Sequence, residues 1–419
     1  MMHRIKQLGL SLIELMVAMA IGLVVMLVVF QLFSVSESTR RTSVAGSDAQ
    51  MSAAIAITAV QDQLRNAGYG LLDRFRDLSN TSFPALGCNV SGVDVRSGTA
   101  VPITYPGAPV ANTFPLAPVV ITQGANNNGA GDGSDSDTIT IVYADLPYPT
   151  VPTNLLQNMA VATDPVLVNN RYGVRPGDVI LLVESNTSVV PAQVAPAPPS
   201  PPVICRLIET TGTPTNPPSP DPNANSTIQR GVGTYLDQGG NNVAVRYNNA
   251  AGTTPLYTTN GAAYNLGRGP SLVQFTVTNN QLTMINRLGA GTAQPAAQPL
   301  VEGVVGLQAQ FGVGVDTTVP ADGIADQFDP GAGLGAWQVA PPAQWGLVLA
   351  VRFAVLTRSS LIERKDDAGN CTATPATSPE LVWAGGAFDV SNIADWQCYR
   401  YKKFEAVVPL RNMVWMPTP

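Results

Sequence analysis

Histidine is almost absent from this chain. The one histidine, His3, precedes a long apolar run, so a Ser-His-Asp or Cys-His catalytic site cannot be built from the rest of the sequence. A glycosidase needs only two carboxylates, but no spacing singles out a pair. We interpret the available acids as turn or surface residues: Asp132, Asp135, Asp137, Glu184, Glu209 and Glu363. The glycine-rich segment 129–133 lacks the lysine of a phosphate-binding loop. An enzyme is therefore not expected.

Charged residues are also scarce. They make up 12% of the chain, and the net charge is -6, so the sequence lacks the basic excess that favours general nucleic-acid binding. Glycine and proline are abundant instead, at 38 and 35 residues. A chain of 419 residues has room for one large domain or two modest ones. We expect a weakly acidic, loop-rich protein, and we find no internal repeat.

Cysteine is limited to four residues, and no Cys-x-x-Cys spacing occurs, which argues against a zinc site. An even number favours disulfides if the chain is exported, and four cysteines allow three pairings. We favour Cys371 with Cys398 and Cys88 with Cys205. The first pair would close a short loop, worth roughly 3 kcal/mol in the chain-entropy model. Unpaired buried thiols are the alternative.

The N-terminal residues form the main apolar run of the sequence. Basic residues near the start lead to a run with no charge between Glu14 and Glu37, which is long enough to span a bilayer as a helix. A secretory signal peptide would be cut after its apolar core, but here the run continues to Phe30 without a polar exit region. Because the basic end normally stays in the cytoplasm, we expect the rest of the chain to be exported.

Glu14 is the unusual residue of this run. An acid near the end of a membrane helix costs on the order of a few kcal/mol, and it suggests either a function or a side chain that reaches back to the interface. A cut between Gly9 and Leu10 would place a new amine about one helical turn from Glu14. On neighbouring subunits of a filament, such an amine would neutralise the carboxylate. We interpret Glu14 as an assembly residue.

The helical pattern continues beyond the apolar run. Over residues 48–66, small and apolar residues fall on one face, whereas Met51 and Ile55 lie nearly opposite. The first face is expected to cover a sheet. Either the second face meets neighbouring subunits, or the helix is an ordinary amphipathic core helix. Gly68 and Gly70 supply a stop signal, and a continuous helix over residues 10–66 would be about 85 Å long.

Beyond Gly70 the sequence predicts short strands between long loops. We expect strands over residues 137–143, 179–184, 203–209, 272–278, 281–287, 344–357 and 399–414. Asn279 and Asn280 suit a hairpin turn, and the proline-rich stretches within 191–222 suit exposed, extended loops. The fold class is therefore α+β, with a long N-terminal helix followed by a large antiparallel head.

Residues 316–329 are the one plausible ligand-binding stretch. Calcium takes several oxygen ligands, often with glycine after an aspartate at a sharp turn, and Asp316, Asp322 and Asp326 have this character. Val319 and Pro320 interrupt the run. A solvated loop is the alternative, and residues 126–137 form a weaker second candidate, so no cofactor is expected apart from this possible calcium ion.

The stretch Gly9-Leu10-Ser11-Leu12-Ile13-Glu14 resembles the class III leader and helix start of type IV pilins and type II secretion pseudopilins. The glycine before the cut and the glutamate five residues after it both match, whereas Leu10 replaces the usual phenylalanine. The resemblance implies that a prepilin peptidase removes residues 1–9 and that Leu10 is methylated. Residues 10–33 would then form the transmembrane and filament-core helix, 34–69 its amphipathic continuation, and 70–419 the head.

Four later segments, residues 65–70, 301–316, 348–359 and 407–413, are together similar to the PilW family of minor pilins. The resemblance implies a single-pass inner-membrane precursor with a periplasmic head, which moves into the pilus (fimbrium) near its tip. The implied partners are other minor pilins, the major pilin and a PilY-type tip adhesin, and the implied processes are pilus assembly, twitching motility and cell adhesion.

Two other functions stay open at this stage. A large pseudopilin of a type II secretion system would share the leader. A membrane-anchored periplasmic binding or hydrolytic protein would use the apolar run only as an anchor. Processing at Gly9 separates the first two functions from the last, because a simple anchor keeps its N-terminus intact.

Overall fold

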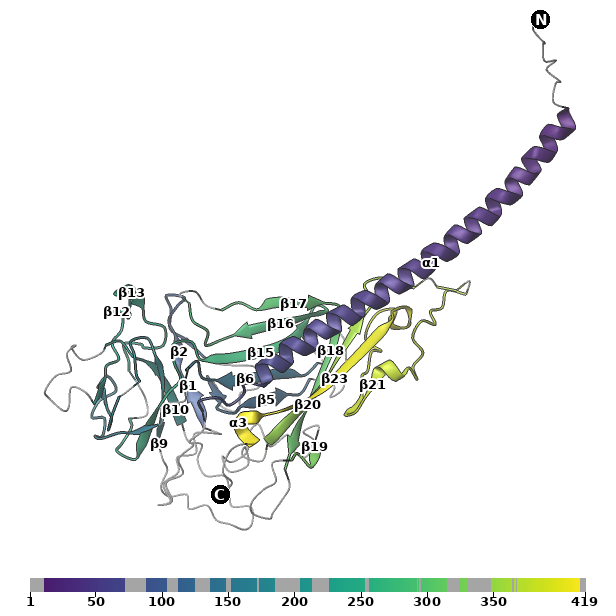
Figure 1. Cartoon of the computed structure of the whole chain (residues 1–419). Coiled ribbons are helices and arrows are strands. Elements are labelled where there is room, and N and C mark those ends of the chain that lie inside the picture. Colours follow the sequence, from purple (N-terminus) through teal and green to yellow (C-terminus); the bar gives the residue numbers. More distant parts are fainter. Residues whose placement is uncertain are drawn as a thin grey trace, which may run out of the picture.

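One long helix carries the N-terminal part of the chain away from a β-rich head (Figure 1). The computed structural model describes residues 11–71, 88–103, 112–124, 136–147, 152–171, 173–184, 204–212, 226–252, 256–291, 293, 295–314, 324–329, 348–363, 365–366 and 368–414. The helix, α1 (Leu12–Leu64), has 53 residues, which corresponds to about 80 Å. The expected continuous helix is therefore present, and the expected first residue, Leu10, lies outside the described residues.

A four-stranded sheet, here called the proximal sheet, lies against the second half of α1. Its strands are, in spatial order, β19 (Gln327–Asp329), β18 (Val304–Val313), β20 (Val348–Arg358) and β23 (Tyr401–Pro409), all antiparallel. Side chains alternate between its two faces, as a pleated strand requires. Phe353 and Val355 face α1, whereas Ala354 and Leu356 face a separate small core on the other side.

The middle sheet continues the head at the C-terminal end of α1. Its order is β17 (Gln298–Glu302), β16 (Gln281–Asn286), β15 (Ser271–Thr278), β6 (Thr138–Tyr143) and β5 (Val119–Thr122). The predicted hairpin joins β15 and β16, and both Asn279 and Asn280 have positive φ angles, 52° and 59°. Two asparagines suit this turn because they tolerate the left-handed conformation better than most residues.

The distal sheet lies farthest from the free end of α1 (Figure 1). Its order is β4 (Thr113–Pro115), β1 (Asn89–Ser91), β10 (Ile204–Glu209), β9 (Val179–Glu184), β14 (Gly261–Asn265) and β7 (Thr153–Asn154). The pairing of β1 with β10 is parallel, and the other pairings are antiparallel. A fully buried disulfide, Cys88–Cys205, joins β10 to the residue before β1.

Short two-stranded ribbons and helical turns complete the described head. The ribbons pair β2 (Val93–Asp94) with β3 (Val101–Pro102), β8 (Val166–Leu167) with β11 (Thr227–Ile228), β12 (Thr234–Leu236) with β13 (Asn242–Ala244), and β21 (Val382–Trp383) with β22 (Gly386–Ala387). The turns are η3 (Pro379–Leu381), η4 (Trp396–Cys398) and α3 (Arg411–Val414).

Two strand predictions need adjustment. The strand expected over 399–414 ends at Pro409, and α3 follows it. Proline has no N–H for the ladder, and the next N–H, that of Leu410, donates to the carbonyl of Leu349 at 2.8 Å. The strand expected over 344–357 is β20, and residues 344–347 lie outside the described residues. Much of the proline-rich 191–222 region also lies outside them.

Candidate assembly helix and its attachment

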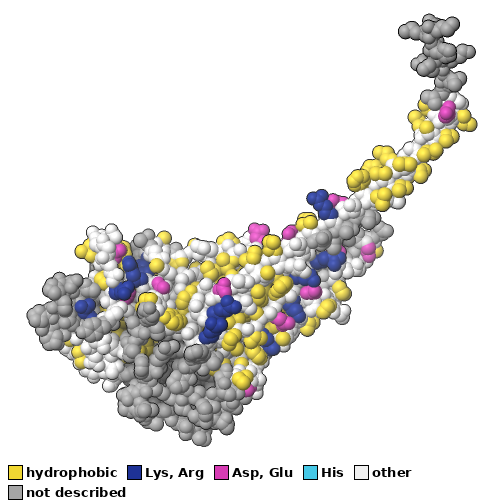
Figure 2. Space-filling view, in the orientation of Figure 1, with side chains coloured by type: hydrophobic (Ala, Val, Ile, Leu, Met, Phe, Trp, Pro, Cys, Tyr) yellow, Lys and Arg dark blue, Asp and Glu magenta, His cyan; other side chains and the backbone are white. Residues whose placement is uncertain are grey.

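The first half of α1 is an apolar rod that no described part of the molecule buries. Residues Leu12–Phe33 have a mean hydropathy of 2.8, and none of them is buried inside the molecule. Figure 2 shows this part of the helix projecting alone from the head, with hydrophobic side chains along it. We call residues 12–33 the stem. Its length and composition are those of a membrane-spanning helix.

Glu14 is the one charged side chain of the stem, and it lies in the first helical turn. The backbone N–H of Glu14 donates to the carbonyl of Ser11 at 3.0 Å, so the helix begins immediately before this residue. A carboxylate in a first turn interacts favourably with the positive end of the helix dipole. Gly9 and Leu10, the predicted processing residues, lie outside the described residues.

The second half of α1 is held by a narrow line of small and aliphatic side chains. We call this line the seam: Ala49, Ala53, Ala56, Val60, Leu64 and Ala67, all buried with at most 2% exposure. Alanine occupies the first three seam positions, and its small side chain allows the helix backbone to lie close to β20 and β23. On the opposite face Met51 and Ile55 are 66% and 48% exposed. The predicted two-faced character of this helix is therefore present.

Side chains from the C-terminal third of the chain fasten the seam at both ends. Near the stem, the buried hydroxyl of Thr357 donates to the carbonyl of Ala49 at 2.9 Å. At the far end, the amide of Asn412 donates to the carbonyl of Ala67 at 2.9 Å. Ala67 lies in the turn that follows α1, so this bond fastens the chain just beyond the end of the helix. The head thus contacts backbone atoms at both limits of the seam.

Two glycines end the helix in close contact with the middle sheet. Gly68 and Gly70 have φ angles of +75° and +73°, which favour glycine. A Cβ atom on Gly70 would lie 2.5 Å from the Cβ of Ala144, so no larger residue fits without movement. The N–H of Gly68 donates to the carbonyl of Val142 at 2.9 Å. The stop signal in the sequence therefore also attaches α1 to β6.

The segments that pointed to one family are distant in sequence but adjacent in space. Residues 65–70, which follow α1, contact Asn412 and Met413 in α3, just after β23. Strands β18, β20 and β23 are neighbours in the proximal sheet, directly beneath the seam. These segments together form the surface on which the second half of α1 lies.

Comparison with protein families agrees with this geometry. Residues 257–412 match the model described as type IV pilus-assembly protein W, PilW, and this range contains the whole proximal sheet. Residues 4–30 match the prokaryotic N-terminal methylation motif, which includes the start of the stem. The chain is a PilW-like type IV pilin. Neither curated proteins nor solved structures gave a significant match to the chain.

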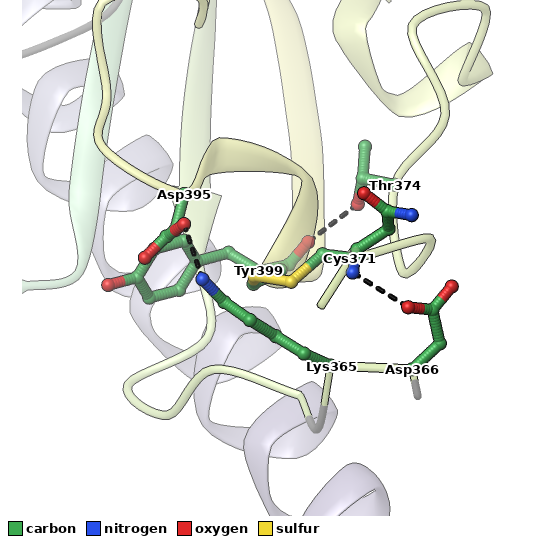
Figure 3. The surroundings of a disulfide bond; sticks show 8 residues. Lys365, Asp366, Cys371, Thr374, Asp395 and Tyr399 are labelled. Atoms are coloured by element: carbon green, nitrogen blue, oxygen red, sulfur yellow. Dashed lines mark hydrogen bonds and ion pairs between the residues drawn. A yellow bond between two sulfur atoms is a disulfide. The ribbon is translucent and has the colours of Figure 1, made fainter. Parts of the chain in front are cut away.

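The PilW-like pilin contains the two disulfides that the cysteine analysis favoured, Cys88–Cys205 and Cys371–Cys398, and it has no free cysteine. Figure 3 shows the second one among short polar contacts. Lys365 pairs with Asp395 at 2.9 Å, and the Thr374 hydroxyl donates to the carbonyl of Tyr399 at 2.6 Å. This disulfide closes the segment that carries η3, β21 and β22 over the outer face of the proximal sheet.

Of the three candidate calcium ligands, Asp326 is the one that lies within the described residues. Asp316 and Asp322 lie outside the described residues. Asp326 is exposed next to β19, and its backbone N–H donates to the carbonyl of Val313 at 3.0 Å. Among the described residues, no group of three or more His, Cys, Asp or Glu side chains is arranged to hold a metal ion. Calcium binding stays a prediction from sequence.

Two of the acids interpreted as turn or surface residues are buried in the PilW-like pilin. Asp137 is 1% exposed and accepts N–H groups from Ala309 at 2.8 Å and Gly124 at 3.1 Å. Burial raises the pKa of this carboxyl to about 6, although the two donors act in the opposite direction. Because β6 and β18 belong to different sheets, Asp137 joins the middle sheet to the proximal sheet.

Glu209, the second buried acid, lies in an ionic network that the sequence analysis missed. It is fully buried and pairs with Arg246 at 3.2 Å. Arg246 and Arg96 both lie over the ring of Tyr247, with their guanidinium carbons 5.1 Å and 5.7 Å from the ring centre. No local sequence motif predicts these contacts, because the partners come from separate strands and loops. Glu184 and Glu363 accept from Thr258 and Arg400, while Asp132 and Asp135 lie outside the described residues.

Proposed function

We propose that this PilW-like pilin is a minor pilin that primes or caps assembly of the type IV pilus. The observation that carries the proposal is the continuity of α1. One unbroken helix combines a bare, membrane-length stem with a half that is fastened to a folded head. A removable anchor needs no such continuity, whereas a subunit whose stem moves from the bilayer into a filament core does.

The proposed pathway begins with an inner-membrane precursor whose head is periplasmic. Prepilin peptidase cuts after Gly9, and Leu10 is methylated. The new amine lies about one helical turn from Glu14, where it can neutralise the carboxylate of a neighbouring stem in an apolar filament core. The family is structural rather than enzymatic. Other minor pilins, the major pilin and a PilY-type tip adhesin are the proposed partners, at or near the pilus tip.

The intact mass and N-terminal sequence of the protein from membranes test this proposal. We expect a chain that begins at methylated Leu10. A chain that begins at Met1 or Met2, in cells that contain the peptidase, would show a simple anchored protein. A correctly processed chain leaves a type II secretion pseudopilin as the second candidate, because the leader is common to both.

Glu14→Ala tests the assembly role directly. Removing the acid lowers the cost of membrane insertion, so we expect normal amounts of inserted protein but at least a several-fold loss of surface pili and twitching. Ser36→Ala, an exposed change on the same helix beyond the stem, is the matched control. Normal piliation in the Glu14→Ala strain would contradict the assembly role.

A further inference from the structure

The loop that follows β20 presents two exposed aliphatic side chains to solvent. Leu361 and Ile362 are 57% and 50% exposed, and neither belongs to a described hydrophobic core. Single exposed apolar residues are common on proteins, but an adjacent pair in a firmly held loop calls for a reason. We call these two residues the stem-end pair.

The direction of β20 places the stem-end pair on the side of the head that faces the stem. The start of this strand lies near the end of α1. The carbonyl of Leu349 accepts from the N–H of Leu410, and Asn412, two residues later, bonds to Ala67 just after α1. Its end lies at the start of the seam, since Thr357 bonds to Ala49. The strand therefore runs antiparallel to α1, and the residues after Thr357 lie nearer the stem. Figure 1 shows the loops at this end of the head beside α1.

The loop is held so that the pair stays exposed. Ser359 donates its N–H to the carbonyl of Arg400 at 2.8 Å and its hydroxyl to the carbonyl of Leu361 at 2.8 Å. Glu363 donates its N–H to the carbonyl of Cys398 at 2.8 Å, beside the disulfide of Figure 3. Both flanks are thus fixed to a cross-linked segment, and the pair has little freedom to turn inward.

The distances place this loop close to the membrane surface. Phe33, the last stem residue, and Ala49 are separated by roughly 24 Å of helix. Four extended residues from Thr357 reach up to about 13 Å toward the stem. These values leave about 11 Å between the pair and the level of Phe33, of which the headgroup layer fills about 5 to 8 Å. A tilt of about 20° is usual for a membrane helix, and a tilt toward the loop brings the pair to the interface when the stem is inserted.

We propose that the stem-end pair, Leu361 and Ile362, docks the head onto the periplasmic surface of the membrane that holds the stem. This inference rests on the proposed membrane-inserted precursor. Because α1 tethers the head to the membrane, the head meets the membrane surface at a high effective concentration, and a weak apolar interaction is sufficient. Among the described cations beside the pair, Arg400 is bonded to Glu363 and Lys365 to Asp395. The exposed aliphatic side chains make the proposed contact apolar, and it must be broken when the subunit leaves the bilayer.

Spin labels on the full chain in phosphatidylcholine bilayers test the docking. All four native cysteines are in disulfides, so Leu361→Cys introduces a single thiol. Val24→Cys in the stem and Leu236→Cys on β12, 62% and 59% exposed in the structure, are the two references. Oxygen concentrates in the bilayer and a nickel chelate in water, so their relaxation effects report depth. We expect the Leu361 label to give an oxygen-to-nickel ratio between those of the two references.

The two reference labels, at Val24 and Leu236, distinguish failure of the docking from failure of the proposed function. A Leu361 label that behaves like the Leu236 label, beside an inserted Val24 label, would overturn the docking and leave the proposed function intact. A Val24 label outside the bilayer would overturn both. A Leu361 label shielded from oxygen and nickel alike would mean that protein covers the pair, which also contradicts docking onto lipid.

A second label position tests the chemistry of the contact. With the label on Ser360→Cys, we expect Leu361→Ser combined with Ile362→Ser to lower the oxygen-to-nickel ratio to that of the Leu236 reference. Val382→Ser, a change of an equally exposed valine on β21, is expected to leave the ratio unchanged. The ratio should also persist in 1 M salt. Its loss in salt would show an electrostatic contact and overturn the apolar one.

Discussion

The two halves of α1 have the same backbone geometry but depend on different surroundings. In the stem, side chains are apolar on every face and none is buried by the molecule itself. In the seam half, only one line of side chains is apolar and buried, and the opposite face is open to solvent. An isolated helix gains little stability from its own hydrogen bonds. The stem therefore needs a membrane or other stems, whereas the seam half needs the head.

The comparison also bears on the proposed move of the stem from the bilayer into a filament. The stem is not buried by the described part of the head, and the hydrogen bonds from Thr357 and Asn412 fasten the chain well beyond it. The stem can consequently exchange lipid neighbours for protein neighbours without disturbing a tertiary contact. A charge on the seam should therefore unfold the head, whereas a charge on the open face should not.

Val60→Asp is the most severe test of this difference. Val60 is fully buried in the seam, so an aspartate there places an unpaired acid among apolar side chains. We expect a loss of about 4 kcal/mol or more in the free energy of unfolding. Met51→Asp, on the open face of the same helix, should cost less than about 1 kcal/mol. Urea unfolding of the full chain in detergent, followed by circular dichroism, measures both.

Equal losses in the two variants would contradict the distinction between seam and open face. They would show instead that the open face is covered in the isolated protein. Val60→Ala is a useful intermediate, because it removes volume from the seam without adding a charge and should cost less than Val60→Asp.

Much of α1 and of the strand set follows from the sequence, because these features depend on near neighbours in the chain. The periodicity over 48–66 identified the seam, and the predicted strand 179–184 has the bounds of β9. The hairpin at Asn279 and Asn280 depends on two residues whose backbone preferences are well known. Local patterns of this kind need no knowledge of the fold.

The features that the sequence did not reveal depend on distant partners. Glu209 carries no mark of burial until Arg246 and the strands around it are in place. The parallel pairing of β1 with β10 joins residues more than a hundred positions apart, and Asn412 bonds to the turn after α1, hundreds of residues earlier. The proposed processing residues, Gly9 and Leu10, rest on the resemblance of this stretch to a leader, and both lie outside the described residues.

The comparison between stem and head extends to two carboxylates, Glu14 in the stem and Asp137 in the head. The head supplies two backbone N–H donors to Asp137. The pKa of Asp137 is raised to about 6 in the folded protein, above its ordinary value of 3.8. Its contribution to stability is therefore fully present below pH 3.8 and is lost as the pH rises through 6. Relative to Asp137→Asn, the native protein should lose about 2 kcal/mol of unfolding free energy between about pH 4 and pH 7.

Urea unfolding at a series of pH values measures this difference. The asparagine variant has one amide oxygen for two backbone donors, so it should be less stable than the native protein at low pH, with a flatter pH profile. Identical profiles in the two proteins would show that Asp137 does not titrate in this range and that its burial is incomplete.

Thr357→Val is the mildest of these tests and concerns the point where the two halves of α1 meet. Valine keeps the shape and burial of Thr357 but removes the hydroxyl that donates to Ala49. We expect a loss of about 1 kcal/mol in unfolding free energy, together with faster amide exchange in the first turn of the seam. Thr357→Ser retains the hydroxyl and should protect those amides better, even though it removes a buried methyl group. If valine protects them as well as threonine does, packing of the seam side chains, rather than this hydrogen bond, sets where the head begins to hold α1.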